Sequence, residues 1–267
     1  MFAEYPDNKD KYRVGPGEDS GKYDIHSPSV YRSKDDGATW ELALRKDWHE
    51  IRHFHTLAAD PFDRGAWWLS SGDRPSECCV WVSRDKGNTW QDFTNRDIKA
   101  DLHPTLQSSA QAVYRYTDVQ ISGTELIWGT DDWLGGPSNV QDQDVPLSHR
   151  AGARLFRSPK TFPLQPRAIG YVGNPVRSIV DVGPAFLVTT EAKRAVLPRP
   201  QVCLVSKANP ELVAELFTVD VIGEGGTGFT YSRASRAARD GTFFSFRGAR
   251  DFANNPVRIL KWQIEFD

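Results

Sequence analysis

Short apolar runs separated by clusters of turn-forming residues recur along the whole chain, and no long stretch shows helical periodicity. This pattern predicts short β-strands throughout and therefore an all-β fold. The predicted strands lie near residues 29–33, 39–45, 52–58, 66–71, 79–83, 89–93, 111–119, 124–129, 152–157, 167–172, 176–182, 185–190, 201–206, 214–220, 229–233, 242–247 and 257–266.

An eight-residue pattern that occurs twice indicates how these strands are organised. Residues 33–40 read S-K-D-D-G-A-T-W, and residues 83–90 read S-R-D-K-G-N-T-W. Both fit S-x-D-x-G-x-T-W, and their starts at positions 33 and 83 are 50 residues apart. This spacing is close to the length of one four-stranded antiparallel sheet. It therefore predicts a radial repeat, the β-propeller, with four-stranded antiparallel blades.

The repeated pattern is chemically suited to a tight turn between two strands. Asp35 can accept hydrogen bonds from the amides of the turn, and Gly37 supplies a backbone angle that a β-carbon would disfavour. Trp40 is expected to restart the next strand with its indole packed on the hairpin. Asp85 and Gly87 repeat the arrangement in the second copy. We interpret both copies as structural markers on the outer rim rather than as sites of chemistry.

The predicted strands form about five blades of a single domain over residues 1–267. Two polar insertions, at 6–28 and 131–150, are candidates to form the walls of a binding site. Residues 2–5 resemble the end of an inner strand, so the first blade lacks its innermost strand and the last blade lacks an outer one. Two interpretations stay open, a compact five-bladed ring or part of a larger propeller truncated at its N-terminus.

Composition and charge limit the classes of partner that the chain is expected to bind. Charged residues make up 25% of the chain and the net charge is −2, so nothing favours nucleic acid or an anionic membrane as partner. No apolar run reaches the roughly 18 residues of a membrane-spanning helix. The sequence predicts no oligomeric state.

The compartment is indicated only weakly. The first residues do not have the pattern of a signal peptide. The chain has three cysteines, Cys78, Cys79 and Cys203, and an odd number cannot all pair within one chain. This usage slightly favours a reducing, cytoplasmic compartment, although a mature secreted protein without its leader would look the same.

The strongest cluster of chemically active residues is Arg52-His53-Phe54-His55. Strand residues two apart point to the same face, so the two histidines would lie side by side. They could act as acid or base, bind an acidic sugar, or ligate a metal with Asp73, or they could simply hydrogen-bond to ordered water. An H-x-H pair without a placed third ligand is a weak metal signal, so no metal or other cofactor is predicted.

Several carboxylates follow strand-like runs and could reach the same channel. Glycoside hydrolysis needs two carboxyl groups, about 5 Å apart for retention or about 6.5–9.5 Å apart for inversion. Asp73 and Asp131 are the preferred pair, with Glu4 and Glu191 as alternatives. Glu77 stands at a similar position. Each of these residues could equally be a turn or capping residue.

Arginines recur at corresponding early positions of the predicted blades, namely Arg52, Arg115, Arg177 and Arg194. Guanidinium groups that converge would bind a carboxylate through paired hydrogen bonds. The predicted ligand is therefore polar or acidic.

Together these residues resemble the Asp-box (BNR-repeat) family of sialidase-like propellers. The resemblance rests on the two boxes and on the order of the residues between them, which are Arg52-His53-Phe54-His55, Asp60-Pro61, Trp67-Trp68-Leu69 and Ser71-Gly72-Asp73. Three further stretches fit the family pattern, namely Glu4-Tyr5, Gln111 to Arg115, and Trp128 to Asp131. The resemblance covers roughly residues 1–195.

The resemblance implies a glycoside hydrolase-like enzyme that acts on a polar or acidic glycan at the mouth of the channel. The catalytic residues would be His53, Asp73, Asp131 and Glu191. The substrate-binding residues would be Glu4, Tyr5, Arg52, His55, Arg115, Trp128, Asp132 and Arg194.

Two other functions stay open. The chain lacks the F/Y-R-I-P motif that carries the first of the three sialidase arginines, so sialidase activity itself is not expected. One alternative is a non-catalytic propeller that binds a glycan or a protein. Another is a polysaccharide lyase, in which the proton-transfer and charge-neutralising roles would fall to His53, His55, Tyr5, Tyr114 and Arg115.

Overall fold

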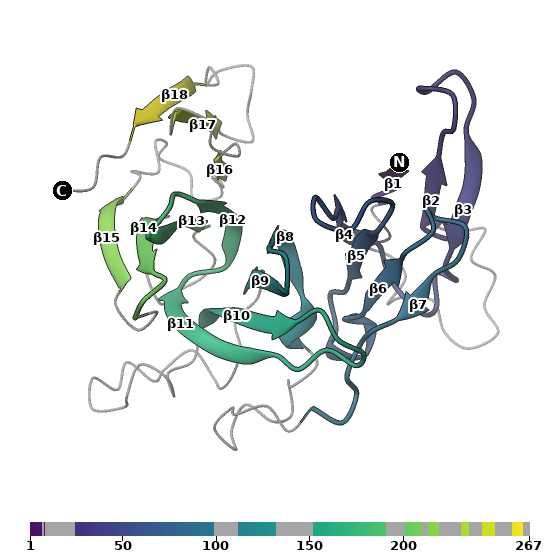
Figure 1. Cartoon of the computed structure of the whole chain (residues 1–267), viewed down its shortest axis with the longest axis horizontal. Helices are drawn as coiled ribbons and strands as arrows, with labels where there is room; N and C mark the ends of the chain where they lie inside the picture. The colour runs from purple at the N-terminus through teal and green to yellow at the C-terminus, as the bar shows by residue number, and fades with distance from the viewer. Residues whose placement is uncertain are drawn as a thin grey trace.

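The structure of the chain, a computed structural model, is all-β and is built from antiparallel sheets (Figure 1). It describes residues 1–6, 8, 25–98, 112–131, 152–190, 201–209, 213–218, 231–234, 242–248 and 258–263. Within this part of the chain, no helix is long and apolar enough to span a membrane.

Five sheets follow one another in chain order, and each is a meander of consecutive strands. The first contains β1 (Phe2–Ala3), β2 (Ser29–Arg32) and β3 (Glu41–Arg45). The second contains β4 (Phe54–Ala59), β5 (Trp67–Ser71), β6 (Val80–Ser83) and β7 (Gln91–Asp92). The third contains β8 (Tyr116–Ile121), β9 (Glu125–Thr130), β10 (Ala153–Pro159) and β11 (Arg167–Gly173). The fourth contains β12 (Val176–Asp181), β13 (Ala185–Thr190), β14 (Gln201–Ser206) and β15 (Val213–Thr218). The fifth contains β16 (Tyr231–Ala234), β17 (Thr242–Gly248) and β18 (Arg258–Gln263).

The sheets are arranged along an arc, with the purple first sheet and the yellow-green last sheet at its two ends (Figure 1). The first strands of successive sheets contact one another, β4 with β8, β8 with β12, and β12 with β16. These first strands lie on the inner side of the arc (Figure 1). Residues at the start of each first strand are thereby brought close to their counterparts in the next sheet.

Hydrophobic clusters fill the interfaces between neighbouring sheets. Successive strand side chains point to opposite faces, so one strand can serve two interfaces. In β6, Val80 and Val82 pack in the cluster shared with the third sheet, while Trp81 packs in the cluster shared with the first. This double burial explains why the strands appear as continuous apolar runs in the sequence.

The two copies of the repeated pattern form the same turn. Asp35 Oδ1 accepts a hydrogen bond from the Thr39 amide at 2.8 Å, and Asp85 Oδ1 accepts one from Thr89 at 2.9 Å. In the first copy, Trp40 packs back on the turn and donates its indole N–H to the Gly37 carbonyl. The turns connect β2 to β3 and β6 to β7, so the three strands of the first sheet correspond to β5, β6 and β7.

The first sheet therefore has three strands where the second has four. Each predicted strand overlaps an observed one, but some bounds differ. The strand predicted at 111–119 begins only at Tyr116, because residues 112–114 form a 3-10 turn. The strand predicted at 89–93 is limited to Gln91–Asp92, because the Thr94 hydroxyl binds the Val80 amide in place of a backbone carbonyl. Most of the insertion at 6–28, and all of the insertion at 131–150 after its first residue, lie outside the described residues.

Candidate functional site

The site lies at one end of the second, third and fourth sheets. In an antiparallel hairpin, the start of the first strand lies beside the end of the second. Phe54 pairs with Ser71 in the second sheet, and Tyr116 pairs with Thr130 in the third. Residues just before β4 and β8 and residues just after β5 and β9 are therefore neighbours at this end, although the sequence separates them.

Asp73, which follows β5, lies between two arginines. Arg52 Nη1 donates to Asp73 Oδ2, and Arg115 Nη2 lies 3.0 Å from Oδ1. The Asp73 side chain is 13% exposed. Arg52 comes from the same sheet and Arg115 from the next, so Asp73 joins two sheets through charge-assisted hydrogen bonds.

Asp131, which follows β9, continues this chain of charges. Arg177 Nη1 lies 2.5 Å from Asp131 Oδ1, and Arg115 Nε lies 3.8 Å from Oδ2. One guanidinium group, that of Arg115, therefore lies between the two carboxylates. Among the described residues, three arginines and two aspartates meet here, and the buried carboxylate of Glu77 lies next to them on the Arg52 amide.

His53, just before β4, and His55, within it, lie beside the Asp73 carboxylate. His53 Nε2 is 3.1 Å from His55 Nε2, which matches the prediction that both rings share one face of the strand. Asp73 Oδ2 lies 3.6 Å from His53 Nε2, and Asp73 Oδ1 lies 3.8 Å from His55 Nε2. Among the described residues, these three form the one group whose donor atoms are close enough to hold a metal ion, all within 4.8 Å of one another.

Tyr5 covers the histidine pair from the segment that follows β1. Its ring stacks on His53 with centroids 3.9 Å apart, yet 64% of the residue stays exposed. Desolvation raises the pKa of the Tyr5 hydroxyl, and the negative charges of Asp73 and Asp131 raise it further. Tyr5 therefore stays protonated at neutral pH and presents one face to solvent.

The surroundings set the protonation of the ionisable groups. Burial and, to a smaller extent, the neighbouring His55 together lower the pKa of His53 to about 4, although Asp73 acts in the opposite direction. Burial alone would raise the pKa of Asp73, but the contact with His55 and the charge of Arg115 outweigh it and hold that pKa well below its usual range. At neutral pH the site therefore contains an ionised Asp73 beside a neutral His53.

Two buried polar residues hold the Arg52 backbone in place. Asn8 Nδ2 donates to the Arg52 carbonyl at 2.8 Å and to the His26 carbonyl at 2.7 Å. Glu77, at the end of the 3-10 helix Pro75–Glu77, accepts from the Arg52 amide at 3.2 Å. Asn8 belongs to no recognisable sequence motif, so the sequence does not indicate that this residue supports the site.

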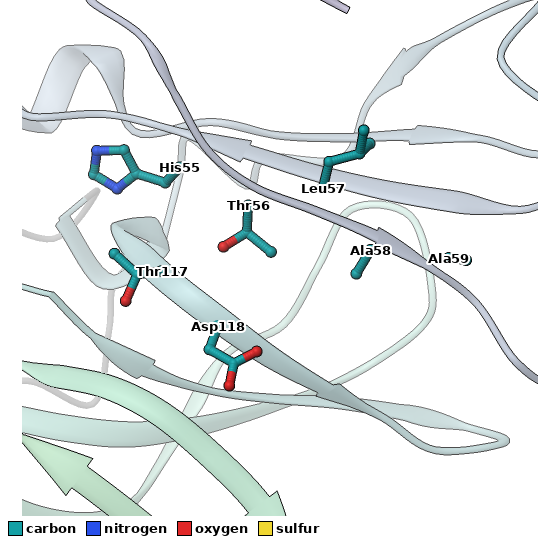
Figure 2. A pocket seen from close by; sticks show the side chains of 7 residues that line it. All are labelled: His55, Thr56, Leu57, Ala58, Ala59, Thr117 and Asp118. Atoms are coloured by element: carbon teal, nitrogen blue, oxygen red, sulfur yellow. The ribbon is translucent and has the colours of Figure 1, made fainter. Parts of the chain in front are cut away.

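A polar pocket adjoins the site. A pocket of about 370 Å³ runs between β4 and β8 and is lined by His55, Thr56, Leu57, Ala58, Ala59, Thr117 and Asp118 (Figure 2). A second pocket of about 260 Å³ lies on the other side of β4, where Tyr5 and His55 are among its lining residues. The larger volume falls within the roughly 300–1,000 Å³ of typical small-ligand sites.

The structure does not bring every predicted residue to this site. Trp128 is completely buried in the core between sheets, where its indole donates to the Val113 carbonyl, so it has no surface with which to bind a substrate. Tyr114 is likewise fully buried. Glu4 is held through its backbone amide to Ser29, and within the described residues no contact joins its carboxylate to the cluster. The predicted residues Glu191, Asp132 and Arg194 lie outside the described residues.

Arg177 belongs to the site, although the expected substrate-binding residues did not include it. It shares the early-blade position of Arg52 and Arg115, and that recurrence is the sequence signal that identifies it. For Arg177, the position in the repeated sheet predicts a place in the site, whereas the family resemblance does not.

Comparison with known proteins does not assign a family. No protein-family model matches the chain, and a search of curated proteins found no significant match. Similar solved structures include the computationally designed Ika4 protein, with 11% identity, a TM-score of 0.38, and coverage of 79% of this chain and 91% of that one. Prolyl oligopeptidase B from Galerina marginata has 9% identity, a TM-score of 0.39, and coverage of 82% and 31%. A puromycin-hydrolysing peptidase from Mycobacterium tuberculosis has 14% identity, a TM-score of 0.34, and coverage of 80% and 33%. The chain spans about a third of the length of these two peptidases.

Proposed function

We propose that the five sheets are blades of a β-propeller of the Asp-box type and that the charged cluster binds an acidic glycan. The order of the sheets, the contacts between their first strands and the two matching turns support the propeller. In such a fold the inner strands supply a ligand site at one mouth of the channel.

The observation that carries the glycan proposal is the convergence of Arg52, Arg115 and Arg177 on two aspartates. These arginines come from three successive sheets. A ligand carboxylate could exchange with Asp73 or Asp131 as a hydrogen-bond partner of these arginines. The exposed ring of Tyr5 offers an apolar face on which a sugar could stack.

Glycoside hydrolysis is the reaction we propose first, with Asp73 and Asp131 as the two carboxylates. They lie on either side of the Arg115 guanidinium, an arrangement that suits the wider spacing of about 6.5–9.5 Å used by inverting enzymes. The charge of Arg115 helps to hold the pKa of Asp73 well below its usual range, which suits a base and not an acid. The phenol of Tyr5 is the nearby protonated group.

One observation favours a lyase as the second candidate. Tyr5 stacks on His53 directly beside the arginines that would neutralise the carboxylate of a uronate. A lyase needs such a neutralising group together with a proton donor and acceptor at the neighbouring carbon. The two reactions leave different products, because elimination creates a carbon–carbon double bond and hydrolysis does not.

The binding experiment compares acidic with neutral oligosaccharides by calorimetry. The wild-type protein should bind the acidic ones more tightly, and Arg177→Gln should weaken that binding by about ten-fold or more, the scale of a lost charged hydrogen bond. The matched control is Arg84→Gln, which removes an exposed arginine paired with Asp63. Equal affinity for acidic and neutral sugars, or equal loss in both variants, would refute the proposal.

The products formed from the same acidic oligosaccharides then distinguish hydrolysis from elimination. New reducing ends without ultraviolet absorbance indicate hydrolysis, while products that absorb as unsaturated uronates indicate elimination. Asp131→Asn should abolish hydrolysis if Asp131 is one of the two carboxylates. Binding of acidic sugars without any product would identify a non-catalytic glycan-binding protein.

A further inference from the structure

The three donor atoms of His53, His55 and Asp73 have the spacing of metal ligands. Two ligands of a tetrahedral zinc ion, each bound at about 2.0–2.1 Å, lie about 3.3 Å apart. The two Nε2 atoms are 3.1 Å apart, and the Asp73 oxygens lie 3.6 and 3.8 Å from them. One donor atom from each residue lies within 4.8 Å of the others, so small movements of the side chains would bring an ion within the roughly 2.0–2.2 Å of zinc–nitrogen and zinc–oxygen bonds.

We infer that His53, His55 and Asp73 form a binding site for a divalent transition-metal ion of the zinc class. Two imidazole nitrogens and one carboxylate suit zinc and its first-row neighbours, whereas Ca²⁺ and Mg²⁺ prefer oxygen ligands alone. Three protein ligands leave one tetrahedral position for water or a ligand, as catalytic zinc sites do. The site does not depend on the proposed glycan function.

The backbone brings the three ligands to one end of one hairpin. His53 comes directly before β4 and His55 lies in it, and because they are two residues apart on extended chain their side chains point to one face. Asp73 follows β5, the strand paired with β4, so the carboxylate reaches the same end of the hairpin. The histidine side chains are nearly fully buried, at 2% and 1% exposed, so their orientation is set by packing.

The arginines beside Asp73 have opposing effects on an ion. Their positive charges weaken the attraction of a cation. They also hydrogen-bond the carboxylate and orient it, as outer-shell partners of metal ligands commonly do. Asp131 offsets part of the arginine charge. We therefore expect specific binding that depends on all three ligands.

The test measures bound metal in protein that carries no histidine tag. Chelator-treated protein is incubated with Zn²⁺, separated from free ion by gel filtration and analysed by elemental mass spectrometry. Wild-type protein should retain one Zn²⁺ per chain, and His53→Ala and His55→Ala should lose it. Asp73→Asn should bind at least ten-fold more weakly. His49→Ala removes an exposed histidine on the segment before β4, and this control should retain the ion.

Two further measurements keep the result interpretable if a variant folds poorly. Co²⁺ in place of Zn²⁺ should give a visible spectrum of four-coordinate nitrogen and oxygen ligation in the wild type, and His55→Gln should abolish it. Zn²⁺ should raise the unfolding temperature of the wild type and of His49→Ala, but not of His55→Gln, because ligands stabilise only the state that binds them. A wild type that retains no ion, or His53 and His55 variants that retain one, would overturn the inference. Glycan binding that persists without metal would leave the proposed function intact.

Discussion

Arg115 contacts Asp73 at both its main chain and its side chain. Nη1 donates to the Asp73 carbonyl at 2.9 Å, and Nη2 lies 3.0 Å from the carboxylate. Arg115 precedes β8 and Asp73 follows β5, so this pair of contacts joins the second sheet to the third. The loop that presents Asp73 is therefore held from the neighbouring sheet as well as from its own.

Arg115→Met should destabilise the protein by about 3 kcal/mol, because removing one partner of a buried ion pair leaves the other charge uncompensated. The free energy of unfolding from urea denaturation measures the loss. Arg84→Met is the matched control, since the Arg84–Asp63 pair is exposed and should cost less than about 1 kcal/mol. Similar losses of unfolding free energy in both variants would show that the Arg115–Asp73 contacts do not stabilise the interface between the two sheets.

Asp60 and Lys160 form a second contact between the same two sheets. Asp60 accepts from the indole of Trp68 at 3.1 Å, from the amide of Phe62 at 2.9 Å and from Lys160 Nζ at 2.8 Å. Asp60→Ala should cost about 3–5 kcal/mol, because it leaves Lys160 and buried N–H donors unpaired. Lys160→Met should cost less, because the carboxylate keeps its N–H donors. Denaturant unfolding of the two variants gives this order, and the reverse order would contradict it.

Asp85 in the second repeated turn should make stability depend on pH. Hydrogen bonds from the backbone and side chain of Thr89 lower its pKa from 3.8 to about 2. The folded state therefore binds this proton less readily than the unfolded state. The stabilisation is fully present above pH 4 and is lost as the pH falls towards 2. Asp85→Asn should flatten this part of the stability profile, as measured by thermal unfolding between pH 2 and pH 6.

Asp35 in the first turn provides an internal control for that experiment. Its pKa is also lowered to about 2, by the matching bonds to Thr39. Asp35→Asn should therefore remove a similar part of the pH dependence. An unchanged acid profile in both variants would show that the turns do not carry this linkage.

Gly72 precedes Asp73 and has little room for a side chain. Its φ is +139°, and a β-carbon would lie 2.5 Å from Cys78 Sγ and 2.9 Å from Cys78 Cα. Gly72→Ala should destabilise the protein by about 1–3 kcal/mol, because the backbone must shift. The control is Gly123→Ala, where an added β-carbon meets nothing within 4 Å. Equal unfolding midpoints for the two variants would contradict this account of the turn.

The three cysteines should be unreactive in the folded protein. Cys78, Cys79 and Cys203 are all buried thiols outside any disulfide, and burial raises the pKa of the Cys79 thiol. Both effects suppress the reactive thiolate. An aromatic disulfide reagent at pH 7 should label none of them in native protein and all three in denaturant. Rapid labelling of the native protein would show that one of the cores opens readily.

The sequence by itself determined the strand order and the turn that recurs. Local chemistry decides both, because S-x-D-x-G-x-T-W closes its hydrogen bonds within eight residues and each strand is a short apolar run. The same-face placement of His53 and His55 is equally local, since it follows from the pleat of one strand.

Only the tertiary structure decided which charged residues meet. Asp73 and Arg115 are 42 positions apart, and their contact depends on how two sheets pack. Trp128 is the opposite case, since it fits the family pattern around the site but packs into the core. A side chain's partners depend on the orientation of neighbouring sheets, and no short stretch of sequence contains that orientation.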